Sequence, residues 1–274
     1  MADFGVTEMA SNDLVLGIVQ ESMRESVRLL PTVKQFEAPK GAQSVRSPRH
    51  DQFTAESKGE NSSLTSQALT FSYDEITLNK QRSVLSRVED IASIQSGPDV
   101  SSAIVSDMGK ELGKAVDAAI ISELKTCSSS PDHTLTYAGS SVAALADILN
   151  ARKLLRDQYV DFSRGDLWMA IAPDIEADIL AISNFVDASK YGEQVAASGF
   201  IGNIMGFKVI VNADLTDGDS LFYSSDACGV AFSQSPTFET SRDLPNVATE
   251  YLASVIFGAK VLAAGKKCVH YTYA

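Results

Sequence analysis

The stretch at residues 97–126 is the longest uninterrupted helical pattern in this 274-residue chain, and it most constrains the fold. Pro98 and Asp99 favour a helix start, because proline needs no donor in the first turn and aspartate faces the positive end of the helix dipole. Apolar residues then recur at every fourth position, at Val100, Ile104, Met108, Leu112, Val116, Ile120 and Leu124. Such a row winds slowly around a helix with 3.6 residues per turn, so different partners must cover different parts of it. At about 1.5 Å per residue the helix would be about 40 Å long, which predicts a plate or a strut rather than a compact core.

The charge of the chain is acidic and unevenly placed. Residues 157–250 hold 15 acidic and 4 basic residues, which accounts for 11 of the 12 net negative charges. A protein that grips duplex DNA neutralises phosphates with a clustered basic face, and the sequence has no such cluster. The composition, with 45% hydrophobic residues, indicates a soluble globular protein with a substantial core.

Three cysteines, Cys127, Cys228 and Cys268, are odd in number and far apart, so we expect free thiols in a reducing compartment. The first residues lack the basic and then apolar pattern of a secretory signal. The most apolar tract, residues 251–265, is short for a membrane span and contains Lys260. The sequence therefore predicts no membrane segment.

The first third of the chain predicts a helix and then a long polar excursion. Residues 11–30 place apolar side chains on one helical stripe, with Pro31 ending it. Residues 32–66 contain almost no large apolar residues, so alone they should be disordered, and another subunit is the simplest means of ordering them. Residues 68–78 alternate like a strand, so the two segments together predict a long hairpin arm.

The remainder predicts local α/β alternation followed by extended strands. Residues 81–95 are compatible with either a helix or a strand. Helices are expected at 141–160 and 174–182, and strands at 167–171, 207–211 and 221–223. Beyond Gly229, the runs at 248–257, 259–264 and 268–273, joined by Gly258 and Gly265, predict an antiparallel meander.

No catalytic or cofactor pattern is present, so the sequence predicts neither an enzyme nor a cofactor or metal site. The three histidines, His50, His133 and His270, are as scattered as the cysteines. Gly199, Gly202 and Gly206 have the wrong spacing for a phosphate loop and indicate a turn. The turn with Asp214, Asp217 and Asp219 lacks the ligand spacing of an EF-hand, so an Asx-type turn is favoured.

The basic residues of the polar excursion are the candidates for contacts between subunits. Lys40, Arg46 and Arg49 form a modest cluster, which we expect to pair with acids of a neighbouring chain, and Lys58 lies in the same segment. Asp214, Asp217 and Asp219 are a second candidate, because like charges of symmetry mates would need a cation or water between them.

The order of these elements resembles the major capsid proteins of tailed bacteriophages with the HK97-type fold. Residues 81–124 look like the segment that leads from that family's extended loop into its spine helix. Residues 167–180 and 191–215 look like its axial domain, and residues 255–274 look like its closing strands.

The resemblance implies an α+β fold with an N-terminal arm at 1–33 and an extended loop at 34–80. It also implies a peripheral domain at 81–135 and 226–274, with the spine helix at 97–126, and an axial domain at 136–225. The function implied is self-assembly into pentamers and hexamers of an icosahedral head around double-stranded DNA. The chain would be part of the virion after assembly in the host cytoplasm, with a separate scaffolding protein and a portal as partners, and its contact with DNA would be independent of sequence.

Two alternatives stay open. One is a nanocompartment shell protein of the same fold, although the expected N-terminal cargo-binding pattern is not seen. The other is a small-molecule enzyme with its ligand at the turn from Gly199 to Gly206, which lacks any nucleophile or base.

Overall fold

The computed structural model describes residues 7–39, 41–50, 53, 55–69, 71–90, 100–138, 143–182 and 202–273. Its helices are α1 (Thr7–Ser26), α3 (Val100–Leu124), α4 (Leu145–Asp157) and α5 (Pro173–Ala181), with 3-10 turns η1 (Leu30–Thr32), η2 (Phe162–Arg164) and η3 (Ala263–Gly265). The strands form three sheets, so the fold is α+β as the sequence predicts. No helix among the described residues is long and apolar enough to cross a bilayer.

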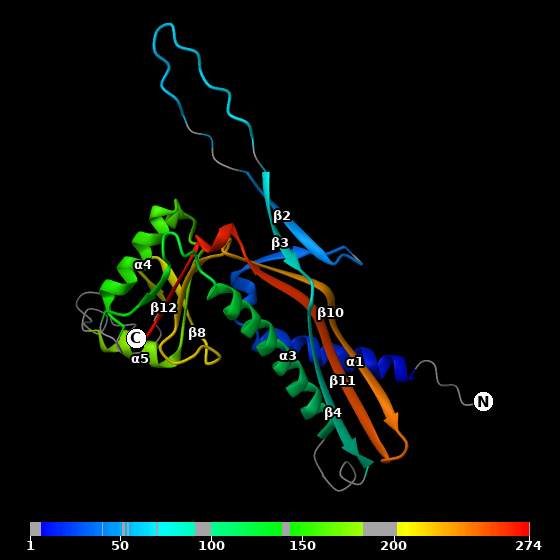
Figure 1. Cartoon of the computed structure of the whole chain (residues 1–274). Helices are drawn as coiled ribbons and strands as arrows, with labels where there is room; N and C mark the ends of the chain where they lie inside the picture. The colour runs from blue at the N-terminus through cyan, green and yellow to red at the C-terminus, as the bar shows by residue number, and fades with distance from the viewer. Residues whose placement is uncertain are drawn as a thin grey trace.

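The spine helix predicted at 97–126 is α3, and its apolar row is buried along most of its length. Met108, Leu112, Val116, Ile120 and Leu124 expose 3% of their surface or less, and Ile104 is partly buried against the same core. The side chain of Val100 lies outside the described residues. Side chains of α1 and of strands β10 (Cys228–Asp243) and β11 (Ala248–Val261) cover this row, and Figure 1 shows α3 alongside them.

Helix α1 packs closely on the spine helix through small residues. A Cβ atom at Gly109 would lie 2.6 Å from the carbonyl oxygen of Val19, and one at Gly113 would lie 3.0 Å from that of Met23. The hydroxyls of Ser22 and Ser106 are hydrogen-bonded at 3.1 Å across the same contact. Two helices approach this closely only where one of them has no side chain in the contact.

Helix α1 ends at Ser26, before the stop predicted at Pro31. The backbone N–H groups of Arg28 and Leu29 donate to the carboxylate of Asp117 on α3 instead of continuing the helical pattern. The chain then enters η1 and the short strand β1 (Lys34–Glu37). A side chain of the spine helix therefore takes the N–H groups of two residues that follow α1.

The sheet beside the spine helix has the order β1-β10-β11-β4, with β4 at Lys80–Glu89. The ambiguous tract at 81–95 is thus a strand as far as Glu89. The sequence predicts that Gly258 joins two strands, but Gly258 lies inside β11. The carbonyl oxygen of Thr77 comes too close to it there for any Cβ atom. The predicted run at 248–257 and the first three residues of the run at 259–264 are therefore parts of one strand, and the rest of the second run lies in the turn that includes η3.

The second sheet has the order β5-β12-β9-β6-β8-β7. Its strands are β5 (Thr134–Thr136), β6 (Leu167–Ile171), β7 (Asn203–Ile204), β8 (Phe207–Val211), β9 (Ser220–Ser224) and β12 (Cys268–Thr272), which confirms the strands predicted at 167–171, 207–211 and 221–223. Side chains of α4 and α5 share a buried core with these strands.

The closing strand β12 corrects the predicted meander. It pairs with β9 and β5 of the six-stranded sheet, not with β11. Gly265 has a φ of 71°, and a Cβ there would lie 2.8 Å from the carbonyl oxygen of Thr126. The glycine thus allows the chain to turn tightly past the end of the spine helix and to enter the other sheet.

Candidate assembly interface

A two-stranded hairpin arm, residues 44–77, projects from the body of the molecule (Figure 1). Its strands β2 (Ser44–His50) and β3 (Phe71–Thr77) pair antiparallel, from Ser44 with Thr77 to His50 with Phe71. The predicted hairpin is therefore confirmed. The predicted strand at 68–78 begins three residues later, at Phe71.

The base of the hairpin arm is anchored in the body. Ile76 is fully buried in a small cluster with Ala231 and Leu262. The carboxylate of Asp74 accepts the backbone N–H of Ala263 at 2.9 Å. Strand β10 and the turn at η3 thus both hold the base of the arm, and the rest of the arm extends from it.

The arm carries apolar side chains that the chain itself does not bury. Five large residues along it each expose 46–61% of their surface: Phe53, Leu64, Leu69, Phe71 and Tyr73. A monomer gains nothing by exposing so much apolar surface on one projection, so this pattern is typical of a surface that another molecule covers.

The basic candidates of the arm are largely exposed. Arg46 forms a 3.5 Å ion pair with Glu75, and Arg49 donates to the hydroxyl of Ser72 at 3.3 Å. A hydrogen bond from Ser44 and the charge of Arg46 lower the pKa of the Glu75 carboxyl. Lys58 is exposed in the loop between the strands, and Lys40 lies outside the described residues.

The second candidate, the acidic turn, divides into exposed and buried residues. Asp214 and Asp217 are exposed. The turn is organised by Asn212, whose side-chain oxygen accepts the N–H of Asp214 at 2.8 Å, which confirms the expected Asx-type turn. No group of three or more potential metal ligands is present in the part of the chain that the structure describes.

Asp219 differs from Asp214 and Asp217, with which it was predicted to form a contact between subunits, because it is buried. It exposes only 4% of its surface, and its carboxylate accepts hydrogen bonds from Lys125 and from His270, the latter at 2.9 Å. Burial opposes its ionisation, but the two donors outweigh burial, and the pKa of Asp219 lies below its ordinary value. Asp219 therefore joins the end of the spine helix to β12 within one chain and is not a surface contact.

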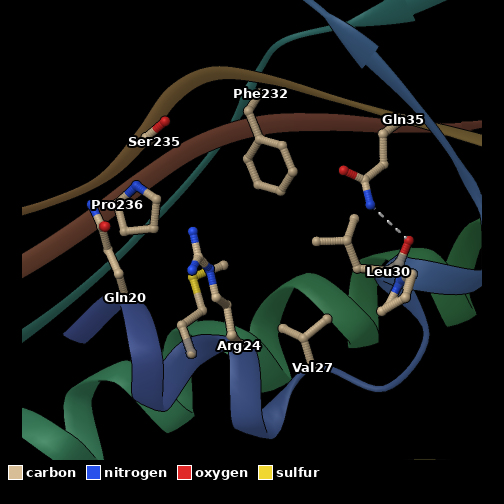
Figure 2. A pocket seen from close by; sticks show the side chains of 10 residues that line it. Gln20, Arg24, Val27, Leu30, Gln35, Phe232, Ser235 and Pro236 are labelled. Carbon is tan, nitrogen blue, oxygen red and sulfur yellow. Dashed lines mark hydrogen bonds between the residues drawn. The ribbon is translucent and has the colours of Figure 1, made fainter. Parts of the chain in front are cut away.

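A pocket of about 470 Å³ lies between α1, η1 and β10. Figure 2 shows Arg24, Val27 and Leu30 on one side of it and Phe232 and Pro236 on the other. The register between β10 and β11 shifts between Phe232 and Thr237, so the strand bulges where it lines this pocket. We call this cavity the α1–β10 pocket.

The remaining candidates have structural roles where they are described. Gly202 and Gly206 have positive φ at the turn around β7, as a turn requires, and Gly199 lies outside the described residues. The ring of His133 is buried and its Nδ1 lies 2.8 Å from the carbonyl oxygen of Cys268. Cys127, Cys228 and Cys268 are free thiols, as predicted.

Comparison with known proteins identifies the family. The sequence profile of the family described as phage capsid protein matches residues 84–270. No curated protein matches the sequence. Among solved structures, one from Mycobacterium phage Che8 has a TM-score of 0.70 at 15% identity, covering 91% of this chain and 90% of that one.

Two further structures show the same fold. The capsid of a native GTA particle gives a TM-score of 0.70 at 13% identity, covering 91% of this chain and 90% of that one. A virus-like particle from Pyrococcus furiosus gives 0.64 at 14% identity, covering 95% and 99%. The fold is thus the HK97-type fold expected from the sequence, and the family profile spans more than half of the chain. The chain belongs to the phage capsid protein family and is a structural major capsid protein.

Proposed function

We propose that copies of this chain form pentamers and hexamers that close into an icosahedral head around double-stranded DNA. The observation that carries this proposal is the projecting arm, because Phe71, Tyr73 and Leu64 are exposed on it and only another subunit would cover them. Arg46, Arg49 and Lys58 on the same arm would pair with acidic groups of the neighbour. Lys40, which precedes the arm, would do the same.

The proposed partners beyond the chain itself are a separate scaffolding protein, a portal and the packaged DNA. The net charge of −12 supports a shell that encloses the DNA without binding it tightly. A basic inner surface would instead bind the duplex through counterion release. Assembly would take place in the host cytoplasm, and the product would be the capsid of the virion.

The proposed domains of the subunit follow the boundaries predicted from the sequence. Residues 81–135 and 226–274, with the spine helix, would form the peripheral domain, and residues 136–225 the axial domain. The exposed carboxylates of Asp214 and Asp217 would approach symmetry mates in the axial domain, where a cation or water would separate like charges. Shells whose stability at neutral pH is indifferent to a chelator would argue against a cation there.

The test is expression of the chain with its genomic neighbours, followed by sedimentation and electron microscopy. The expected result is large closed particles of uniform size. A uniformly monomeric, ligand-binding species would overturn the proposal in favour of a small-molecule binding protein.

Limited proteolysis tests the role of the polar segment at 34–66. We expect rapid cleavage there in dispersed subunits and protection in assembled shells, because the segment has few apolar residues to bury within its own chain. Cleavage within the buried spine helix, for example after Lys114, should be slow in both states and serves as the internal control. Equal protection of 34–66 in both states would contradict the proposal.

A nanocompartment shell of the same fold is the second candidate, and the likeness to a virus-like particle from Pyrococcus furiosus is compatible with it. The match to the phage capsid family favours the phage head. The contents of purified particles distinguish the two, because a head made in infected cells holds DNA and a nanocompartment holds protein.

A further inference from the structure

The α1–β10 pocket has an apolar floor and one cation at its rim. Met23, Val27, Leu30 and Phe232 supply apolar surface, and Gln20 and Ser235 supply polar edges. Arg24 is exposed and lies across the pocket from Pro236 and Phe232 in Figure 2. Within the described residues, no carboxylate pairs with this guanidinium. The pocket therefore fits a short apolar side chain followed or preceded by an acidic one.

The loop of the hairpin arm has this combination. Gly59 and Ser62 close a turn at its tip, where the Ser62 hydroxyl accepts the N–H of Gly59 at 2.9 Å. Glu60 sits in this turn, exposed and without an ion-pair partner among the described residues. Leu64 follows four residues later and exposes 58% of its surface.

The other acid among the described residues of the loop is already used within it. The carboxylate of Glu56 accepts the backbone N–H of Thr65 at 3.1 Å and so ties the two sides of the loop together. Among the described residues of the loop, this leaves Glu60 as the carboxylate free for an external cation. The contact also holds Thr65, next to Leu64, to the opposite side of the loop.

We propose that the loop of a second copy docks in the α1–β10 pocket, with its Leu64 on the apolar floor and its Glu60 on Arg24. This proposal rests on the proposed function, since it names the site that receives the arm of an adjacent subunit. The arm of the same chain does not fill the pocket, because it projects away from α1 (Figure 1).

The arm is long enough to reach a neighbour. Seven paired residues from Ser44 to His50 span about 23 Å at about 3.3 Å per residue. The 20 residues between His50 and Phe71 allow a loop that extends about 30 Å further at most. An arm of this length crosses a neighbouring subunit of ordinary domain size.

A disulfide tests the docking directly and leaves the Leu64 anchor in place. In a Ser63→Cys/Ser235→Cys chain, assembled particles oxidised under mild conditions should yield covalent multimers on a non-reducing gel, because a disulfide forms only where the two Cα atoms lie within about 7 Å. The matched control is Ser63→Cys/Ser241→Cys, in which the second cysteine lies on the same strand about 20 Å away and is also exposed. Ser63→Cys alone controls for the native thiols, of which Cys228 and Cys268 are buried.

A charge swap tests the ion pair. Arg24→Glu and Glu60→Arg should each raise the subunit concentration needed for assembly by about two- to fivefold, as expected for an interface-rim pair. The double variant should return it toward the wild-type value. Leu64→Ala should raise that concentration by about tenfold or more, because a central apolar anchor is lost.

The outcomes separate this inference from the proposed function. If wild-type subunits give no particles, both are wrong. If particles form but the Ser235 pair does not cross-link, or the control pair cross-links equally well, the α1–β10 pocket is not the docking site. Charge reversals that do not compensate each other in assembled particles contradict the pairing of Arg24 with Glu60.

Discussion

The buried carboxylate of Asp117 on the spine helix accepts the backbone N–H of Arg28 at 2.8 Å. It also accepts the N–H of Leu29, so one acid from the middle of α3 holds the end of α1, almost 90 residues earlier in the chain. Burial raises the pKa of this carboxyl, while the backbone donors favour the charged form. The contact fixes where the first helix ends.

Asp117→Asn should weaken this contact between α1 and α3 and lower the free energy of unfolding. One oxygen of Asp117 accepts both N–H groups, so the single oxygen of asparagine can replace it there, but without the charge that strengthens these hydrogen bonds. The other carboxylate oxygen becomes an NH₂ donor in a buried place, and we expect a total cost of about 1–3 kcal/mol. Urea unfolding of dispersed subunits measures this cost. Asp107→Asn, an exposed position on the same helix, is the control, and an equal loss in both variants would show that Asp117 has no special role.

Gly109→Ala should weaken the packing of α1 on the spine helix. The added methyl would meet the backbone carbonyl of Val19, which cannot move aside as a side chain would, so we expect a loss of about 1–3 kcal/mol despite the better helix propensity of alanine. Gly17→Ala on α1 has open space around it and should instead gain about 0.5–1 kcal/mol. Thermal unfolding of both variants decides the matter, and a stabilised Gly109→Ala chain would refute the tight contact.

Much of the fold could be predicted from the sequence, because periodicity reports burial directly. The row from Ile104 to Leu124 and the strands at 167–171 and 207–211 lie where their patterns predict. Which strands pair is not a local property. The pattern of β12 is that of any buried strand, and only the turn at Gly265 sends it to the six-stranded sheet rather than alongside β11.

The candidate site was predictable in outline and not in detail. A polar excursion ending in an alternating strand predicts the arm, whereas Asp219 looks like its exposed neighbours Asp214 and Asp217 until Lys125 and His270 are brought beside it. Gly109 and Asp117 were missed because a glycine or an acid within a helix is usually on its exposed face. Gly109, Gly113 and Asp117 recur at every fourth position, next to the apolar row of α3, and this second row is the signal that could have found them.

Leu112→Asp should prevent the accumulation of soluble subunit. Leu112 is fully buried in the centre of the spine helix, and an unpaired buried charge costs several kcal/mol, roughly the whole stability of a domain. Met108→Asp should behave in the same way. Lys110→Asp, exposed between them, is the control and should give normal yield. Soluble expression and particle formation measure the effect, and normal particles from Leu112→Asp would refute the role of α3 as a buried spine.

Asp219→Asn should change how stability depends on pH. Because the folded-state pKa of Asp219 is lowered, its carboxylate stabilises the fold above the unfolded value of about 3.9, and this contribution is lost as the pH falls through the folded value. The part of the difference in unfolding free energy between wild type and variant that comes from the Asp219 charge should therefore be present in full above the unfolded value and shrink below about pH 4. Asp217→Asn, exposed in the same turn, should stay within about 0.5 kcal/mol of wild type. A difference for Asp219→Asn that persists undiminished at about pH 3 would contradict the lowered pKa of this carboxyl, because the loss would then not come from its charge.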